Sequence, residues 1–349
     1  MHRQKKITTI LPAEWEKQSF LQFTFPHKNS DWKYLLEEVS ACFVEIIEAA
    51  AKFQDVLVVC DDVTRVKSFF ENTQNISFVE AKSNDTWARD HSGITVLEDE
   101  KAIIHDYIFN GWGKKFEAAL DNQITKKLFD KGIFQNCNLE SFNFVLEGGS
   151  IESDGKRTIL TTSECLLSKN RNELFSKEEI ENLLKQNLGA KRILWLNHGD
   201  LSGDDTDSHI DTLARFCDEN TIVYVGCNNP NDEHFEALQN MKKELQQFIR
   251  QNGEPYHLVE LPLPKACYNS EGNRLPATYA NFTIINGAVL IPVYGVPEDK
   301  IAVEILKKCF PLREIIPLNC RVLIEQHGSL HCITMQYPEP VKLNKEILK

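Results

Sequence analysis

A cysteine near the carboxyl end of the chain is the first candidate for a reactive group. Cys332 follows a turn over residues 327–330 that contains Gly328, and it precedes an alternation of apolar and polar residues over 333–336. We expect the turn to become a strand at this cysteine, which would expose the thiol while the backbone holds it in place. The alternative is a buried core cysteine, one of ten in the chain.

Acid and histidine side chains upstream are the natural partners of this thiol. The candidates are Asp90, Glu147, His209 and Asp211, and each follows a segment with the pattern of a strand. If repeated units of structure carry them to one centre, the thiol faces a ring of carboxylates. Carboxylates pair with the N–H groups of a guanidinium two at a time. The residue types therefore predict a cysteine nucleophile that acts on a planar cation.

The segment around His209 permits three interpretations. On a strand, His209 and Asp211 would share one face because they are two residues apart, and we expect a strand here. Together with Asp207 they also form a cluster of oxygen and nitrogen ligands of the kind that binds a metal ion. A solvated acidic loop is the third interpretation.

Several of these residues also have structural explanations. His331 adjoins the cysteine, but neighbouring side chains of an extended segment point to opposite faces. We therefore expect His331 to be structural and His209 to be the base. Asp90 or Asp85 could serve only to neutralise a buried Arg89. Glu147 precedes two glycines, where the backbone can approach a ligand closely, or it is an exposed glutamate in a turn.

The composition limits the class of protein. Of the 349 residues, 42% are hydrophobic and 26% charged, as in a globular protein with a sizeable core. The net charge of −12 and the lack of a basic stripe argue against nucleic acid as a partner. No apolar run reaches membrane-spanning length, so no membrane association is expected. The cysteines are scattered without a CxxC pair or zinc-binding spacing, which indicates a reduced, cytoplasmic protein.

Strand and helix patterns alternate along the whole chain. A strand–strand–helix–strand order returns roughly every 60–70 residues, which predicts about five similar modules. Ser176 and Glu179 form a capping box for one helix, which is expected to end at Gly189. No linker or low-complexity tract divides the sequence, so residues 1–349 are expected to form a single domain.

Eight segments resemble the motifs of one enzyme family, the agmatine deiminases and the related bacterial peptidylarginine deiminases. The segments are Leu11-Pro12-Ala13-Glu14-Trp15, Pro26-His27 with Asp31-Trp32, Asn84-Asp85-Thr86-Trp87-Ala88-Arg89-Asp90, Phe109-Asn110-Gly111-Trp112-Gly113-Lys114, Glu147-Gly148-Gly149, Asp205-Thr206-Asp207-Ser208-His209-Ile210-Asp211, Tyr279-Ala280-Asn281-Phe282 and His331-Cys332-Ile333-Thr334. They stand in the family's order and span nearly the whole chain.

The resemblance implies both a fold and an activity. The fold is a five-bladed α/β propeller (pentein) of repeated strand–helix modules with pseudo-fivefold symmetry. The activity is hydrolysis of the guanidinium of agmatine to N-carbamoylputrescine and ammonia, in polyamine (putrescine) biosynthesis. It proceeds through a covalent cysteine thiouronium intermediate, and the resemblance implies no metal ion and no other cofactor. The family also suggests a homodimer.

The resemblance also assigns roles to individual residues. It implies that Cys332 is the nucleophile and that His209 is the general acid and base. It implies that Asp90 and Asp211 bind the guanidinium and that Glu147 assists the histidine or the substrate. Trp87 and Trp112 would bind the substrate.

The chain departs from the family pattern at three places beside the expected site. Residues 327–330 are His-Gly-Ser-Leu where a glycine-rich run is usual, Ser208 stands where a glycine is usual, and residues 91–93 are His-Ser-Gly rather than Thr-Gly-Pro. These departures do not change the residues expected to carry out the reaction. They leave open the identity of the end of the substrate that lies away from the guanidinium.

Other functions therefore stay open. A peptidylarginine or free-arginine deiminase would use the same chemistry and would need a basic residue for the carboxylate, with Arg89, Arg274 and Arg321 as candidates. An amidinotransferase would pass the same intermediate to an amine. A metal-dependent hydrolase built on the acidic cluster at His209 and a non-catalytic binding protein for cationic amines belong to different classes.

Overall fold

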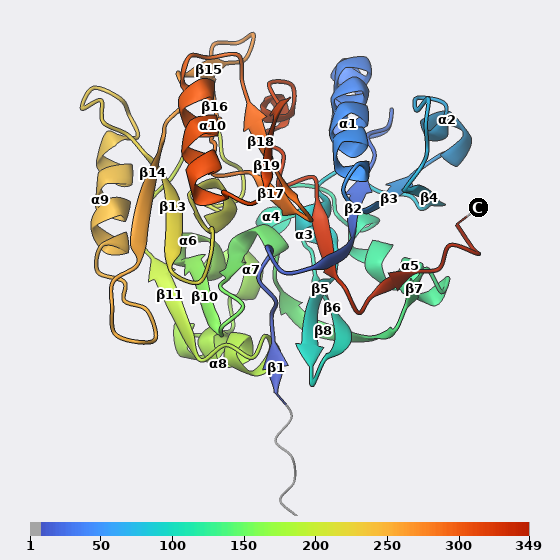
Figure 1. The fold of residues 1–349 in the computed structure, drawn as a ribbon, viewed down its shortest axis with the longest axis horizontal. Helices are drawn as coiled ribbons and strands as arrows, with labels where there is room; N and C mark the ends of the chain where they lie inside the picture. Colours follow the sequence, from blue (N-terminus) through green and yellow to red (C-terminus); the bar gives the residue numbers. More distant parts are fainter. Residues whose placement is uncertain (1–7, 349) are drawn as a thin grey trace, which may run out of the picture.

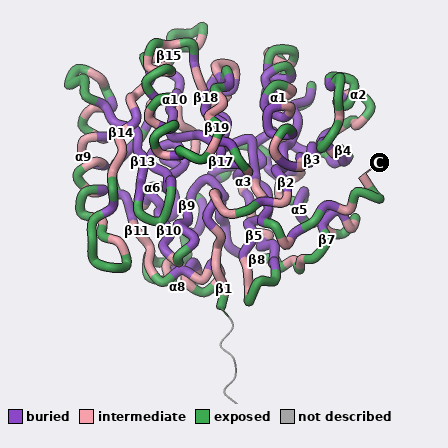
Figure 2. The backbone as a smooth tube through the Cα atoms, viewed as in Figure 1, coloured by how far each residue is buried: buried purple, intermediate pink, exposed green. Residues whose placement is uncertain are grey.

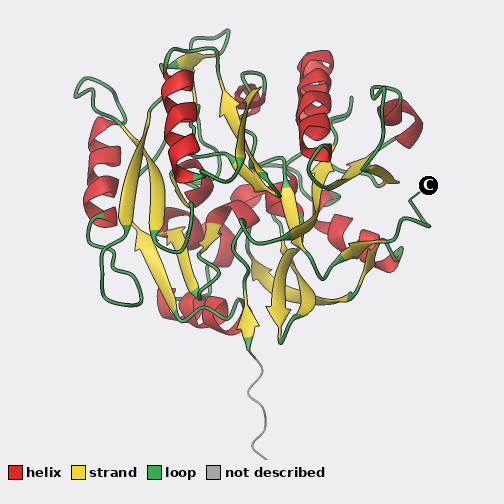
Figure 3. Cartoon of the chain, viewed as in Figure 1, coloured by secondary structure: helices red, strands yellow, loops and turns green. Residues whose placement is uncertain are grey.

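Five β-sheets of three or four strands form the middle of the computed structural model, which describes residues 8–348 (Figures 1 and 3). In each sheet, one strand pairs antiparallel with one neighbour and parallel with the other. Two of the sheets have four strands. The first consists of β20 (Met335–Pro338), β2 (Gln18–Thr24), β3 (Asp55–Cys60) and β4 (Ile76–Glu80). The second consists of β1 (Thr9–Ile10), β5 (Ile94–Glu98), β6 (Lys101–Ile108) and β8 (Cys137–Val145). The other three sheets have three strands each. One consists of β9 (Ile151–Ser153), β10 (Thr158–Thr162) and β11 (Arg192–Leu196), and the next of β12 (Ala214–Phe216), β13 (Thr221–Gly226) and β14 (His257–Pro262). The last consists of β17 (Thr283–Ile285), β18 (Ala288–Val293) and β19 (Glu314–Asn319).

In every one of these sheets, a helix connects the central strand of the antiparallel pair to its parallel neighbour, as a parallel crossover requires. The connecting helices are α1 (Leu36–Ala51), α5 (Ile124–Asp130), α8 (Lys177–Asn187), α9 (Phe235–Leu245) and α10 (Glu298–Cys309). This order confirms the rhythm predicted from the sequence. The backbone of the central strands is buried while the long helices turn exposed faces outward (Figure 2).

The remaining elements are short. They are α2 (Val63–Lys67), α3 (Ala88–His91), α4 (Gly111–Lys114), α6 (Ser163–Leu166), α7 (Lys169–Asn172), the 3-10 helices η1 (Asp31–Leu35), η2 (Asp121–Gln123), η3 (Gly148–Ser150), η4 (Ile210–Thr212) and η5 (Leu323–Gln326), and the strand pairs β15 (Cys267–Tyr268) with β16 (Arg274–Leu275) and β7 (Phe134–Gln135) with β21 (Lys342–Leu343). Across residues 8–348, no helix is both long enough and apolar enough to cross a membrane. All ten cysteines are free thiols.

Local sequence signals explain several of these boundaries. The predicted capping box is present at the start of α8, where the Ser176 hydroxyl accepts from the backbone N–H of Glu179 and the Glu179 carboxylate accepts in return. Gly189, just beyond α8, has a φ of +68°, a left-handed conformation that favours glycine. The C-terminal strand β20 pairs with β2, with Gln336 opposite Leu21. This pairing anchors the loop that carries Cys332 to the N-terminal part of the chain.

Two local predictions near the expected site are wrong. His209 and Asp211 do not lie on a strand, because His209 precedes η4 and its carbonyl accepts from the Thr212 backbone N–H in a turn. Cys332 does not stand at a strand end either. Its loop closes a second turn, in which the Thr334 N–H bonds to the His331 carbonyl, and β20 begins only at Met335.

Candidate active site

Cys332 is a buried residue that lines a pocket together with Trp87, Asp90 and Trp112. Its Sγ lies 3.4 Å from Asn281 Oδ1 and 3.9 Å from Asp211 Oδ2. Burial, followed by the negative charges of Asp211 and Asp90, raises the pKa of the Cys332 thiol well above its usual value. The thiol is therefore protonated at neutral pH until a cation offsets those charges.

Asp90 lies in α3, and two donors hold its carboxylate. The Gly149 backbone N–H donates to Oδ1 at 3.1 Å, and the Trp112 indole N–H donates to Oδ2 at 2.9 Å. Burial raises the pKa of Asp90 to about 6, against the lowering effects of His209 and of the Trp112 hydrogen bond. Arg89, which the sequence offered as a structural partner for Asp90, instead donates to the Gln336 side chain at 2.6 Å.

Gly149 marks the point at which the candidate residues meet. A Cβ atom added to it would lie 2.7 Å from His209 Nδ1, 2.8 Å from Asp90 Oδ1 and 3.1 Å from Asp211 Oδ2. The three side chains thus surround one small volume, although they are far apart in the sequence. Because Asp211 Oδ2 is also close to Cys332, the structure brings together four of the predicted site residues.

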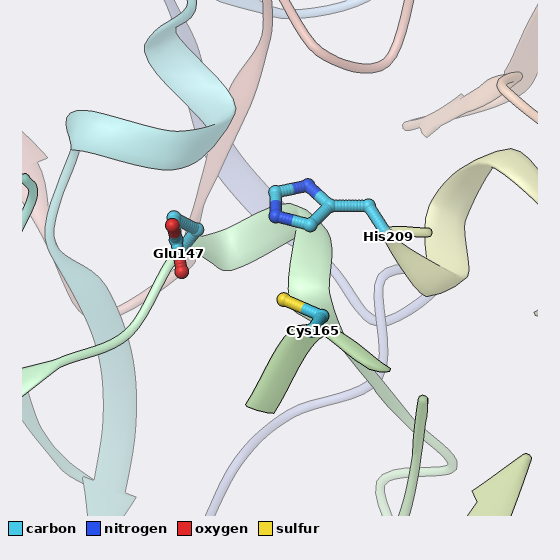
Figure 4. A group of neighbouring side chains, drawn as sticks. All are labelled: Glu147, Cys165 and His209. Atoms are coloured by element: carbon cyan, nitrogen blue, oxygen red, sulfur yellow. The ribbon is translucent and has the colours of Figure 1, made fainter. Parts of the chain in front are cut away.

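Glu147 completes this group beside His209. The carboxylate of Glu147, the Cys165 thiol and the His209 ring offer ligand atoms that all lie within 4.8 Å of one another (Figure 4). Glu147 is fully buried, so the interpretation as an exposed turn glutamate is wrong, and its Oε1 accepts from Arg171 at 2.8 Å. The guanidinium of Arg171 already neutralises this carboxylate, which makes the group less suited to a metal cation.

His209 is held ready to donate a proton. Burial opposes its protonation, but Asp90 at 3.6 Å, Cys165 and Glu147 outweigh that effect and raise the pKa of His209 to about 10. A protonated imidazole beside a buried thiol is a suitable general acid for a departing amine. The other acid of the predicted metal cluster, Asp207, faces Lys115 and Arg171 instead, so that cluster does not form.

Four buried polar atoms around this centre lack a hydrogen-bond partner within residues 8–348. They are Asp211 Oδ1, Glu147 Oε2 and both ring nitrogens of His209. A buried acceptor without a partner is unfavourable, so such atoms indicate a site whose hydrogen bonds are completed by a ligand. Two free carboxylate oxygens suit a ligand that brings several N–H groups and a positive charge.

The two tryptophans predicted for the pocket are held in place in different ways, Trp112 by left-handed backbone and Trp87 by close packing. Trp112 lies in α4, where residues 111–114 all have positive φ, and Trp112 itself has a φ of 53° and a ψ of 50°. A left-handed turn of this kind costs about 1–2 kcal/mol for each non-glycine residue. Trp87 donates to Asp85 at 3.0 Å, and a Cβ on Gly328 would lie 2.1 Å from its ring. Gly328 is therefore required for close packing against Trp87.

The departures from the family pattern have a partial explanation in backbone conformation. Ser208 and His327 adopt φ values of 61° and 68°, the left-handed region that favours glycine. Asp204 accepts from the Ser208 N–H at 2.7 Å, and the Gly203 carbonyl lies 2.6 Å from His327 Nδ1. These contacts stabilise non-glycine residues in a conformation that is otherwise unfavourable.

A buried group of charged residues next to Asp211 was not predicted from the sequence. His331 Nδ1 lies 2.7 Å from Asp211 Oδ2, and its Nε2 lies 2.8 Å from Glu14 Oε2. Arg215 pairs with Glu14 at 2.5 Å and with Glu152 at 2.8 Å. Burial opposes ionisation of Glu14, but Arg215 and His331 hold the pKa of Glu14 well below its usual range. The only signal was Glu14 within the first family motif, which gives no hint of its partner more than 300 residues away.

The family of the chain follows from comparison with known proteins. The model of the Porphyromonas-type peptidyl-arginine deiminases matches residues 10–338, which include every element that carries a site residue. The chain belongs to this family. The resemblance inferred from the eight motifs is thereby confirmed.

Known relatives of this deiminase family member match it over nearly their full length. The agmatine deiminase of Stutzerimonas stutzeri (strain A1501) is 30% identical over 355 residues, 95% of each chain. An agmatine deiminase of C. jejuni, solved as a cysteine-to-serine variant with substrate bound, is 39% identical, with a TM-score of 0.91 and coverage of 96% of this chain and 98% of that one. A solved structure described as a putative arginine deiminase from Porphyromonas gingivalis is 48% identical, with a TM-score of 0.92 and coverage of 96% of this chain and 99% of that one. The chain thus shares its α/β fold with solved agmatine deiminases.

Proposed function

We propose that this chain is an agmatine deiminase, a hydrolase that acts on the carbon–nitrogen bond of an amidine. The observation that favours agmatine is the charge of the pocket. Beyond Cys332 and Asp90 the pocket is lined by Asp31, Asp85 and Asp205, and its lining includes no lysine or arginine of residues 8–348. Agmatine carries a guanidinium at one end and an ammonium at the other, so an acidic lining attracts both ends.

Free arginine fits this pocket less well. It adds a carboxylate beside the ammonium, which the acidic lining repels. The three arginines considered as carboxylate partners are engaged elsewhere: Arg89 with Gln336, Arg274 with Asp232, and Arg321 with Glu325. A deiminase of free arginine is therefore the second candidate. The substrate of a peptidylarginine deiminase lacks that carboxylate, so an activity assay with a blocked arginine peptide distinguishes this function from agmatine hydrolysis.

The first half of the reaction forms the covalent intermediate. Asp90 and Asp211 bind opposite edges of the guanidinium and present its central carbon to Cys332. The bound cation offsets the negative charges that hold the thiol protonated, and the thiol releases its proton to solvent. The thiolate attacks the carbon, and the electron pair of one C=N bond moves to nitrogen. His209 donates a proton to a terminal nitrogen, the C–N bond breaks, and ammonia leaves a thiouronium on Sγ.

The second half returns the enzyme to its starting state. A water molecule loses a proton to His209 and attacks the thiouronium carbon. The C–S bond then breaks, its electron pair moves to sulfur, and the proton that remains on the oxygen of the new urea passes to Cys332, which restores the thiol. The product is N-carbamoylputrescine, and one water is consumed for each ammonia released. Transfer to water rather than to an amine distinguishes the deiminase from an amidinotransferase.

We also infer that the five sheets are the blades of a five-bladed propeller with pseudo-fivefold symmetry. The common strand pairing and the crossover helix in each sheet support this arrangement. On the same view, residues 1–349 form one domain. A cytoplasmic location, a place in putrescine biosynthesis and a homodimer remain predictions from the sequence, and light scattering of the purified protein tests the homodimer.

The chemistry is tested by intact-mass analysis of protein quenched in acid during turnover of agmatine. We expect a fraction of the protein to carry one added amidine group, which peptide mapping locates on Cys332. Cys332→Ser should carry none, while Cys60→Ser, a change of a second buried cysteine, should still carry it. An adduct mapped to any other cysteine, or its absence during measurable turnover, contradicts the mechanism.

A further inference from the structure

The carboxylate of Asp211 contacts His331, which in turn contacts Glu14, and the mechanism above uses neither of these two residues. One oxygen of Asp211, Oδ2, lies 2.7 Å from His331 Nδ1, whereas the other, Oδ1, is buried without a hydrogen-bond partner among residues 8–348. The far side of the His331 ring lies 2.8 Å from Glu14. The three groups form a chain from the first motif of the sequence to the substrate position.

The hydrogen bonds of this chain centre on the His331 ring. An ionised carboxylate can only accept hydrogen bonds, and a neutral imidazole carries one N–H. Both ring nitrogens of His331 face carboxylates at hydrogen-bond distance, while burial and the charges of Arg215 and Arg89 lower the pKa of the ring. Arg215, which pairs with Glu14 and Glu152, and Arg89 are the other charged groups that face the chain.

Glu14 is itself fixed by the backbone and by this arginine. Its Oε1 accepts from the Ile284 N–H at 2.6 Å, and its Oε2 accepts from Arg215. Glu14 and His331 also line a second cavity, and this cavity shares no lining residue with the pocket at Cys332. Their side chains therefore do not line the pocket, and the side chain of His331 contacts the site residue Asp211.

We propose that Glu14 and His331 are positioning residues that fix Asp211 for binding of the guanidinium. His331, held by Glu14, binds Oδ2 and so leaves Oδ1 free to accept from the substrate. This inference rests on the proposed function, since it assigns the residues a part in agmatine binding.

The test compares Glu14→Gln with Glu152→Gln in the full-length protein. Both variants remove one carboxylate from Arg215, but only Glu14 touches His331. We expect both to lower the melting temperature. Loss of a charged hydrogen bond is worth roughly ten- to hundredfold in an equilibrium constant, so Glu14→Gln should raise the KM for agmatine by about that factor. Glu152→Gln should leave KM within about twofold of the wild type.

A double-mutant cycle separates positioning from general destabilisation. If Glu14 acts through Asp211, Glu14→Gln should weaken agmatine binding in the Cys332→Ala protein but have little further effect once Asp211→Asn is also present. Calorimetry of agmatine binding measures each corner of the cycle. Equal effects of Glu14→Gln with and without Asp211→Asn, or equal KM shifts for Glu14→Gln and Glu152→Gln, would overturn the proposal.

A second variant covers the case in which Glu14→Gln does not fold. His331→Asn places an amide near the position of Nδ1 while it loses the contact with Glu14, and it should also raise KM. An unchanged KM in folded His331→Asn protein would contradict the proposal. Failure of the proposed function itself looks different, because the wild type would then neither bind nor hydrolyse agmatine.

Discussion

Asp211 Oδ2 lies 3.9 Å from the sulfur of Cys332, so the proposed nucleophile and a proposed guanidinium-binding carboxylate are in direct contact. Such closeness is unfavourable for a thiolate and favourable for a bound cation. The site therefore couples the two events, because the substrate supplies the positive charge that the nucleophile needs.

The first prediction concerns ionisation of the thiol. Negative charge and burial raise the pKa of Cys332 in the free enzyme, so a bound guanidinium should lower it. Titration of thiolate absorbance, taken as the difference between the wild type and Cys332→Ser, should show a midpoint at lower pH when a non-reactive guanidinium analogue is bound. An identical midpoint with and without the analogue would contradict the coupling.

The second prediction concerns the acid limb of substrate binding. Asp90 has a pKa of about 6 and must be ionised to bind a cation. Since a raised carboxyl pKa means protonation as the pH falls through that value, agmatine affinity of the Cys332→Ala protein should fall about tenfold per pH unit below it. Trp112→Phe removes a hydrogen bond that lowers this pKa, so the fall should begin at higher pH.

Trp195→Phe is the matched control for this experiment. The Trp195 indole donates to Glu181 at 2.9 Å, as Trp112 donates to Asp90, but Trp195 does not line the pocket. Its replacement should leave the pH dependence of agmatine affinity unchanged. A shift of equal size in both variants would mean that Trp112 does not act through Asp90.

The third prediction concerns Gly149. An added methyl group would lie within 3 Å of His209 and Asp90, so Gly149→Ala must displace at least one of them. A displacement of about 1 Å at reacting groups costs roughly a hundredfold in rate, so kcat/KM should fall by about that factor. Gly226→Ala, whose methyl group would meet Glu260 instead, should lower stability without this loss of activity per folded molecule. Wild-type activity in Gly149→Ala would show that the groups do not need this geometry.

The sequence predicted the overall order of elements and the family, because hydrophobic periodicity and motif spacing can be recognised in a single sequence. It did not carry the local geometry of the site. His331 was expected to point away from the face used by Cys332, but the turn that closes at Thr334 lets both residues reach Asp211. Side chains alternate between two faces only where the backbone is extended. Here, hydrogen bonds between side chains and backbone hold the segment in a turn instead.

Long-range ion pairs were also beyond the sequence. Glu14 meets His331 and Arg215 across hundreds of residues, and Arg171 meets Glu147. Buried charges need partners, but the identity of each partner depends on which strands end at the same place. A count of acids and bases gives no such information.

Ammonia release from the purified protein tests the central claim most directly. Agmatine, free arginine and a blocked arginine peptide are supplied in parallel, after treatment with a chelator and with Cys332→Ser beside the wild type. We predict release from agmatine, no release above background in Cys332→Ser, and little release from the other two substrates. Release from the peptide or from arginine in preference to agmatine would contradict the proposed substrate, and release that persists in Cys332→Ser would contradict the proposed nucleophile.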